Sequence, residues 1–377
     1  MRAMCAAHDT LECTKSRLEQ EQPDSMPTLP ELDDPRIKLA WWGPPRHPPA
    51  MYLRLWIVAA IGLALVVTAP FLDRQDARNP GPQYGIGMGA VQPLGDTLPD
   101  IERLMATVRV LADDSLSGRE AGSDENASVA RWLMDRLGTL GVPPAATGYQ
   151  MPFTWPGGSG TNVMGRIQGS DGTSLIVLTA HFDHVGVREG AIYNGADDNA
   201  SGTAALLELA RLLVEDPPSA DVLVAFLDAE EVGLQGARAL VRQPPLPFPA
   251  SIVNVNLDMV SRSGGTLWAA GAHHTPALRP ILETVAQAGP ATLRLGHDRP
   301  DAPEGDDWTH ASDHGPFHEA GIPFVYFGVE DHEDYHRPSD DVEKIVPAEF
   351  EASVQTIYAA VRALDAALPL TITEPAR

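Results

Sequence analysis

The chain has 377 residues, 44% of them apolar, which is enough to bury a substantial core in about one large domain. Its formal net charge of −24 argues against nucleic-acid binding, because a polyanion would be repelled. The two cysteines, Cys5 and Cys13, both lie near the N-terminus, so the rest of the chain needs no disulfide and tolerates an oxidising compartment.

The first 98 residues are predicted to lie outside the folded domain. Residues 1–50 are polar and rich in proline without periodicity, which predicts a disordered segment. Within the segment 51–73, residues 55–72 form an uncharged apolar stretch whose length fits either a signal anchor or a cleaved signal peptide. Residues 74–98 are polar and rich in glycine and proline, which indicates a linker.

Export follows from either interpretation of the apolar stretch. Basic residues between positions 36 and 54 precede it and favour an N-terminus inside the cell. We therefore expect a periplasmic or extracellular protein, anchored to the inner membrane by residues 55–72 if the segment is not cleaved. Met51 is an alternative start, from which residues 51–72 look like an ordinary signal peptide.

Residues 99–368 are predicted to form one globular domain, followed by a tail at 369–377. The predicted elements are, in chain order, helices at 101–111 and 127–140, strands at 162–167 and 174–180, a helix at 201–213, strands at 221–227 and 251–257, a helix at 277–288, a strand at 322–327 and a helix at 350–364. The alternation of strands and helices predicts an α/β fold with a mostly parallel sheet.

Side chains that bind metals follow four of these predicted strands. In chain order they are His181 and Asp183, then Asp228, Glu230 and Glu231, then Asp258 and finally His336, with Asp197 and Asp198 in a turn between the first two of these strands. In an open α/β sheet, ligands bind outside the carboxyl ends of the strands. Histidine and carboxylate donors without cysteine suit zinc or a similar divalent ion. The pattern therefore predicts a metalloenzyme.

The spacing within the pattern suggests how the side chains divide the chemistry. His181 and Asp183 are two residues apart, so in extended chain they face the same side, and Asp183 can orient the imidazole of His181. Glu230 and Glu231 are adjacent and point to opposite sides, so one can bind metal while the other accepts a proton from water. Two histidines and three carboxylates exceed the needs of one zinc ion and fit a pair of metals bridged by a carboxylate.

The motifs around these residues resemble metallopeptidase family 28, the co-catalytic di-zinc aminopeptidases. The resemblance covers about residues 162–341. The motifs are Thr-Ala-His-Phe-Asp-His-Val-Gly at 179–186, Asn-Gly-Ala-Asp-Asp-Asn-Ala-Ser-Gly at 194–202, Phe-Leu-Asp-Ala-Glu-Glu-Val-Gly-Leu-Gln-Gly at 226–236, Asn-Leu-Asp-Met at 256–259, Ser-Asp-His-Gly-Pro-Phe at 312–317 and Tyr-His-Arg-Pro-Ser-Asp at 335–340. Six motifs in this order make the resemblance specific.

The resemblance implies a role for each matching residue. Asp198 would bridge two zinc ions. His181 and Asp258 would complete the ligands of one ion, and Glu231 and His336 those of the other. Glu230 would be the general base, with Asp183 supporting His181.

The fold implied is a three-layer α/β/α sandwich around a mixed, mostly parallel sheet, of the phosphorylase/hydrolase-like type and without the protease-associated insert of many relatives. The function implied is that of an exported zinc-dependent aminopeptidase. Such an enzyme hydrolyses the N-terminal bond of peptides through a metal-bridging water activated by a glutamate base.

Three other classes share features of this pattern. Glutaminyl cyclases perform acyl transfer on a single zinc ion and lack an equivalent of His181. Dinuclear carboxypeptidases and deacylases carry a dimerisation insert too long for the 77 residues between Asp258 and His336. Receptor-like ectodomains of this fold have lost their ligands, which are all present here.

The remaining histidines and acids near the motifs are interpreted more plainly. We expect turn formation or supporting hydrogen bonds from His184, Asp197, Asp313 and His314. We expect surface or rim positions for His273, His274, His310, His318 and His332.

Overall fold

The computed structural model of the chain describes residues 98–303 and 305–370. The predicted N-terminal and signal segments, nearly all of the linker and most of the C-terminal tail lie outside these residues. Among the described residues, no helix is both long enough and apolar enough to cross a membrane.

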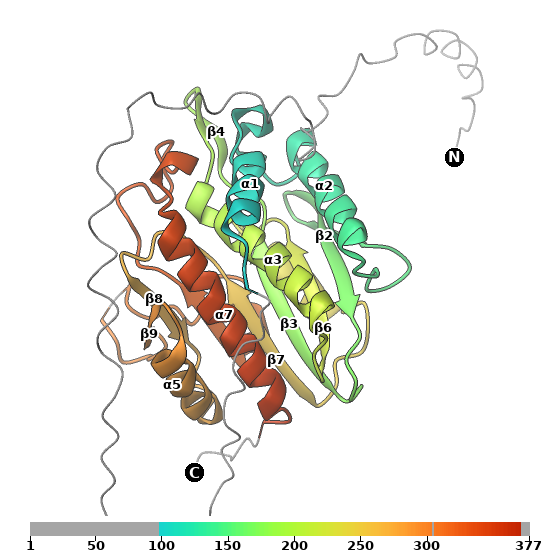
Figure 1. Cartoon of the computed structure of the whole chain (residues 1–377). Helices are drawn as coiled ribbons and strands as arrows, with labels where there is room; N and C mark the ends of the chain where they lie inside the picture. Colours follow the sequence, from blue (N-terminus) through green and yellow to red (C-terminus); the bar gives the residue numbers. More distant parts are fainter. Residues whose placement is uncertain (1–97, 304, 371–377) are drawn as a thin grey trace, which may run out of the picture.

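Within the described residues, eight strands form one twisted sheet (Figure 1). In spatial order they are β1 (Gln150–Trp155), β2 (Gly158–Ile167), β6 (Asp221–Leu227), β3 (Ser174–His181), β7 (Ser251–Leu257), β10 (Phe324–Gly328), β8 (Thr266–Ala270) and β9 (Thr292–Leu295). The central strands β6, β3, β7 and β10 are parallel. The β1–β2, β2–β6 and β8–β10 pairs are antiparallel, so the sheet is mixed, as the sequence predicted.

Helices cover both faces of the sheet. One face carries α1 (Ile101–Leu111), α2 (Asp124–Leu140), α3 (Gly202–Glu215), α5 (Arg279–Ala288) and α7 (Pro347–Ala367), which lie in front of the strands in Figure 1. The other face carries α4 (Gln235–Arg242) and α6 (His314–Glu319), which pack against each other. This arrangement confirms the predicted three-layer sandwich.

Alternation of apolar side chains along the central strands explains the two covered faces. In β3, Ile176 and Leu178 belong to the large core cluster beneath α1, α2, α3 and α7. Their neighbours Leu175 and Val177 point to the opposite face and pack with Leu240 of α4. A strand buried on both faces reads as a continuous apolar run, which is why the central strands are recognisable in the sequence.

Helix boundaries follow local capping. Helix α2 begins three residues earlier than predicted, because the Ser123 hydroxyl accepts the backbone N–H of Asn126 at 3.0 Å. It ends as predicted at Gly141, whose φ of 76° is left-handed. Helix α7 extends beyond the predicted segment at both ends. The strands and α-helices that were not predicted from the sequence have eight residues or fewer; they are β1, β4 (Gly186–Arg188), β5 (Ala191–Tyr193), β8, β9, α4 and α6.

Short irregular elements connect the layers. They are the 3₁₀ turns η2 (Asp114–Arg119), η4 (Pro276–Leu278) and η5 (Val342–Lys344), the π-type turn η3 (Ala196–Ser201) and the hairpin of β4 and β5.

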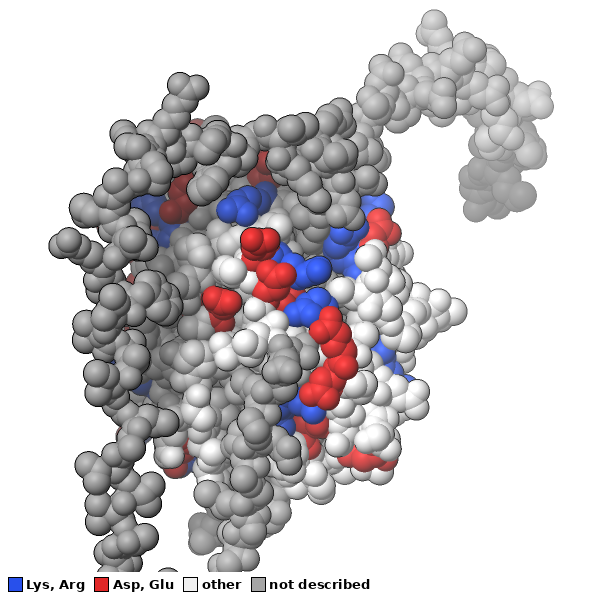
Figure 2. Space-filling model, in the orientation of Figure 1, with Lys and Arg blue, Asp and Glu red and all other residues white. Residues whose placement is uncertain are grey.

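On the face shown in Figure 2, acidic and basic side chains lie next to one another. Ion pairs of this kind join Arg211 to Glu208 and Glu215 along α3, each at 2.6 Å.

Candidate metal centre

Three neighbouring parallel strands deliver their polar ends to one edge of the sheet. Strand β3 ends at His181, β6 ends just before Asp228, and β7 ends just before Asp258. The carboxyl ends of β6, β3 and β7 lie side by side, because these strands are paired in parallel. The turn η3 leads into α3 at the same edge and contributes Asp198.

A first group of donors forms around His181. Its Nε2 lies 3.4 Å from Asp198 Oδ1 and 3.3 Å from Asp258 Oδ1. All three side chains are almost completely buried. The family resemblance implied that these three residues are ligands of one metal, and the fold brings them together.

A second group forms around His336. Its Nε2 lies 3.1 Å from Asp198 Oδ2 and 3.2 Å from Glu231 Oε2. The two carboxylate oxygens of Asp198 therefore face different groups, which is the geometry of a bridging ligand. His184, which we expected to play only a supporting part, belongs to this group, with its Nδ1 2.7 Å from Glu231 Oε1.

Asp183 contacts the His181 ring of the first group on the side away from Asp198. The ring nitrogen of His181 that faces away from Asp198, Nδ1, lies 3.2 Å from the backbone carbonyl of Asp183 and 3.7 Å from its Oδ1. The same carboxylate accepts the backbone N–H groups of Glu230 at 3.0 Å and Glu231 at 3.3 Å. Asp183 thus orients the imidazole of His181 through its backbone carbonyl, and through its carboxylate it fixes the turn that carries both glutamates.

The backbone around Asp198 is held by two further carboxylates. Asp340 accepts the backbone N–H of Asp198 at 3.1 Å and that of Asp197 as well. Asp197 accepts both the hydroxyl and the backbone N–H of Ser261, at 2.6 and 2.9 Å. Its second oxygen lies 3.2 Å from His332 Nε2. His332, expected at the surface or rim, is 12% exposed and contacts this network.

Arg119 was not predicted as a site residue, yet it holds several loops of the centre together. It is fully buried, and its guanidinium donates to the carbonyls of Phe182, Leu111, Asn194 and Gly195 at distances of 2.9, 2.5, 2.6 and 3.1 Å. Burial lowers its pKa to about 10, so the side chain stays charged at neutral pH. In the sequence, an arginine in a polar loop carries no signal that it is buried.

The electrostatics of Glu230 suit proton transfer. Burial raises the pKa of its carboxyl well above the usual value; His181 opposes this shift, whereas Asp313 and Asp258 add to it. Positive charge at the metal positions would also oppose the shift. A carboxyl group with a raised pKa is suited to accept a proton from water and to return it.

Asp313 lies in the same buried environment. Burial raises its pKa to about 7, and neither of its carboxylate oxygens has a hydrogen-bond partner among the described residues. His314, the next residue, is also buried, and its Nε2 lies 2.7 Å from the carbonyl of Trp308.

The donor set fits a pair of divalent metal ions. Nitrogen and oxygen donors converge in two buried groups that share Asp198. Within the described residues, several polar atoms of the centre have no hydrogen-bond partner, namely Glu231 Oε1 and both ring nitrogens of His184. Buried polar atoms are rarely left unpaired, so these atoms indicate a partner such as a metal ion.

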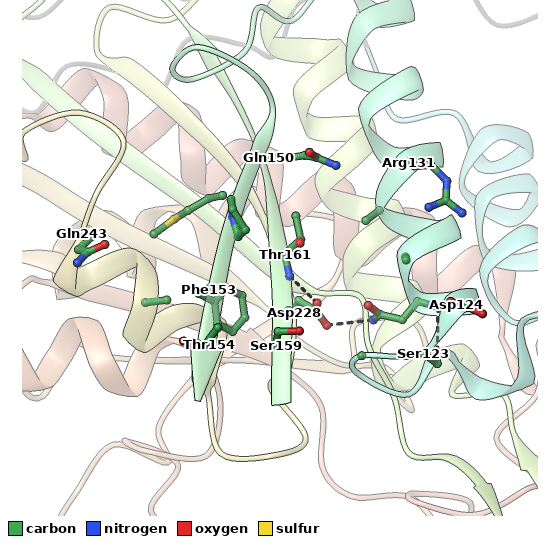
Figure 3. Close-up of a pocket in the computed structure, with 18 of the residues that line it drawn as sticks. Ser123, Asp124, Arg131, Gln150, Phe153, Thr154, Ser159, Thr161, Asp228 and Gln243 are labelled. Carbon is green, nitrogen blue, oxygen red and sulfur yellow. Dashed lines mark hydrogen bonds between the residues drawn. The ribbon is translucent and has the colours of Figure 1, made fainter. Parts of the chain in front are cut away.

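A separate cavity of about 750 Å³ lies beside α2, β1, β2 and the end of α4 (Figure 3). Asp228 faces this cavity, and its carboxylate accepts the backbone N–H of Thr161 at 2.8 Å and the side-chain amide of Asn126 at 3.0 Å. No residue of the two donor groups lines the cavity. Asp228 therefore supports the strand ends rather than the metal positions.

Comparison with known proteins places these residues in a family. A model described as peptidase family M28 matches residues 162–361, which are more than half of the chain and include all seven residues predicted for the site. Aminopeptidase YwaD of Bacillus subtilis is 33% identical over 196 residues, which make up 50% of this chain and only 40% of that protein. A probable leucine aminopeptidase of Arthroderma otae is 27% identical over 274 residues, covering 68% of this chain and 71% of that protein.

Solved structures share the fold at low sequence identity. A zinc aminopeptidase from Bacillus subtilis has a TM-score of 0.57 and 18% identity, covering 71% of this chain and 95% of that chain. Glutaminyl cyclase from Porphyromonas gingivalis has a TM-score of 0.58 and 20% identity, covering 70% of this chain and 98% of that chain. The family model and the fold together confirm the predicted resemblance: the chain belongs to peptidase family M28.

Proposed function

We propose that this chain is a zinc-dependent aminopeptidase that hydrolyses the N-terminal bond of peptides at a two-metal centre. The observation that carries the proposal is the sharing of Asp198 between two groups of donors, with a distance of 3.4 Å to His181 on one side and 3.1 Å to His336 on the other. The names of the relatives, an aminopeptidase and a probable leucine aminopeptidase, support the same activity.

The residues around the centre supply the remaining chemistry. When bound, the two metal ions would acidify the attacking water and polarise the scissile carbonyl. Glu230 would accept a proton from this water and return it to the amine that leaves. Asp183 would hold both partners in place, since it contacts His181 and accepts the backbone N–H of Glu230.

The second candidate is intramolecular acyl transfer, because a glutaminyl cyclase shares the fold. The complete first group, with His181 and Asp258 3.3 Å apart, favours hydrolysis at two metals over transfer at one. The two activities are separable with small substrates, because only hydrolysis releases the intact N-terminal amino acid.

A panel of aminoacyl-arylamides, assayed on the full chain with zinc present, tests the proposal. We expect release of arylamine and free amino acid from substrates with a free α-amino group, and none from the N-acetylated versions. A glutaminyl substrate that yields a cyclised product without free glutamine would favour the transferase instead. If no substrate of the panel is cleaved by zinc-loaded protein, the proposed activity is wrong.

We also propose that the domain is exported and meets its peptide substrates outside the cytoplasm. The support is the apolar stretch at 55–72 in the sequence, which lies outside the described residues. Fractionation of cells that express the full chain tests this proposal. Recovery of the protein in the cytoplasm alone would contradict it.

A further inference from the structure

We propose that the imidazole of His184 is a direct ligand of the second metal, so that this position has four protein donors while the first position has only three. The donors of the second position would be His184, Asp198, Glu231 and His336. The inference rests on the proposed two-metal function and adds a ligand to it.

The side chain of His184 is buried in the centre, where carboxylate oxygens of Glu231 and Asp198 lie 2.7 and 3.8 Å from its Nδ1. It is fully buried, and neither of its ring nitrogens has a hydrogen-bond partner among the described residues. Its ring packs against Gly195, where an added Cβ would come within 2.5 Å of ring carbons. The absence of a side chain at Gly195 therefore makes the space that the ring occupies. An imidazole buried in this way is costly unless something binds it.

The contact between His184 and Glu231 is not an ordinary hydrogen bond. Nδ1 and Oε1 are only 2.7 Å apart, yet neither atom has a hydrogen-bond partner among the described residues. The lone pairs of His184 Nδ1 and Glu231 Oε1 are expected to repel each other at this distance when no proton lies between them. A cation held between them removes that repulsion.

The distances within the second group match those between ligands of one ion. Donor atoms of a tetrahedral zinc site lie roughly 3.3–3.4 Å apart, given metal–ligand bonds of about 2.0–2.1 Å. His184 Nδ1 lies 2.7 Å from Glu231 Oε1 and 3.8 Å from Asp198 Oδ2. His336 Nε2 lies 3.1 and 3.2 Å from oxygens of the same two carboxylates. The two distances of His336 are close to the expected value, whereas those of His184 lie on either side of it, so a bound ion would draw the His184 ring slightly into place.

The two positions would then differ in how many places they leave for water or substrate. Zinc sites closed by four protein ligands are typically structural, whereas catalytic sites keep a place open. The first group offers His181, Asp198 and Asp258 and leaves such a place. We therefore infer that the first metal exchanges more readily than the second, which is held tightly and gains a place for the shared water only by expanding to five ligands.

Replacement of His184 by cysteine provides a direct test of coordination. A thiolate bound to Co²⁺ gives a charge-transfer absorption band in the near ultraviolet, and Cys has a reach from Cβ similar to that of the Nδ1 atom of His. Full-length His184→Cys protein, freed of metal and titrated with Co²⁺, should develop this band at the second equivalent or earlier. The matched control is His318→Cys, which places a thiol outside both donor groups. It should show only the background of the wild type, which contains Cys5 and Cys13.

A second measurement covers the case in which the cysteine variant fails to fold. In histidine-labelled wild-type protein, nitrogen NMR should show three imidazoles that change on zinc loading, and one of these signals should be missing in His184→Ala. The same His184→Ala change should lower the affinity for the second zinc ion by more than roughly 10–100-fold, which is the cost of losing a supporting hydrogen-bond partner.

The outcomes separate this inference from the proposed function. If the wild type binds two metals but His184→Cys folds without the charge-transfer band, or only two imidazoles respond to zinc, His184 is not a ligand and the two-metal function stands. If the wild type binds only one metal with full activity, the two-metal centre itself is wrong.

Discussion

Shortening Arg119 to lysine should destabilise the domain measurably while preserving its charge. The guanidinium of Arg119 donates to four backbone carbonyls, among them those of Phe182 and Gly195, which lie in loops of the candidate metal centre. An ammonium group has three donors, so Arg119→Lys loses at least one of these four hydrogen bonds.

The size of the effect follows from this count. A hydrogen bond to a charged group contributes about 1.5–3 kcal/mol. For a domain of this size, each kcal/mol lost lowers the melting temperature by roughly 2–4 °C. One lost bond therefore predicts a decrease of about 3–12 °C. Arg119→Met would leave all four carbonyls without this donor, and we expect it to abolish folding, since the loss is comparable to the whole stability of a typical domain.

Thermal unfolding followed by calorimetry provides the assay. Metal-free and zinc-loaded samples should be compared at fixed zinc concentration, because ligand binding shifts the melting temperature. Arg103→Lys is the matched control, since the Arg103 side chain is 62% exposed and its change should stay within about 0.5 kcal/mol. If Arg119→Lys melts within one or two degrees of the wild type in both states, the four-bond account of Arg119 is wrong.

Four further predictions concern the base, the metals and the N-terminal segment. Glu230→Gln should retain both metals and lower kcat by about 10²–10⁴ with little change in KM, and loss of a metal or near-normal turnover would contradict its role. Glu231→Gln should instead weaken the binding of one metal ion, so that excess zinc restores part of the activity. Unchanged zinc affinity would show that Glu231 is not a ligand. Metal analysis of extensively dialysed wild type should find two divalent ions per chain, whereas one ion with full activity would refute the paired centre. Deletion of residues 1–73 should leave a soluble, active enzyme, because every candidate site residue lies beyond position 180, and aggregation of the shortened chain would speak against this.

Much of this protein could be predicted from the sequence because the relevant physics is local. A central strand buried on both faces must be apolar throughout, so the segments at 174–180, 221–227 and 251–257 stand out. Metal donors follow such strands directly, and parallel pairing then brings His181 and Asp258 to one edge. These signals were sufficient to predict an α/β fold with candidate metal donors at one edge of its sheet. The choice of five ligands among those donors came from the family resemblance.

Other features were decided only by the tertiary structure. His184 is three residues beyond His181 in a polar loop, and its ring reaches Glu231 only because Gly195 leaves space for it. Arg119 and His332 look like solvent-exposed loop residues in the sequence, yet the first is buried against backbone carbonyls and the second contacts Asp197 from 135 positions away. Burial and partners of such residues depend on segments far apart in the chain, and no local pattern of spacing or composition encodes them.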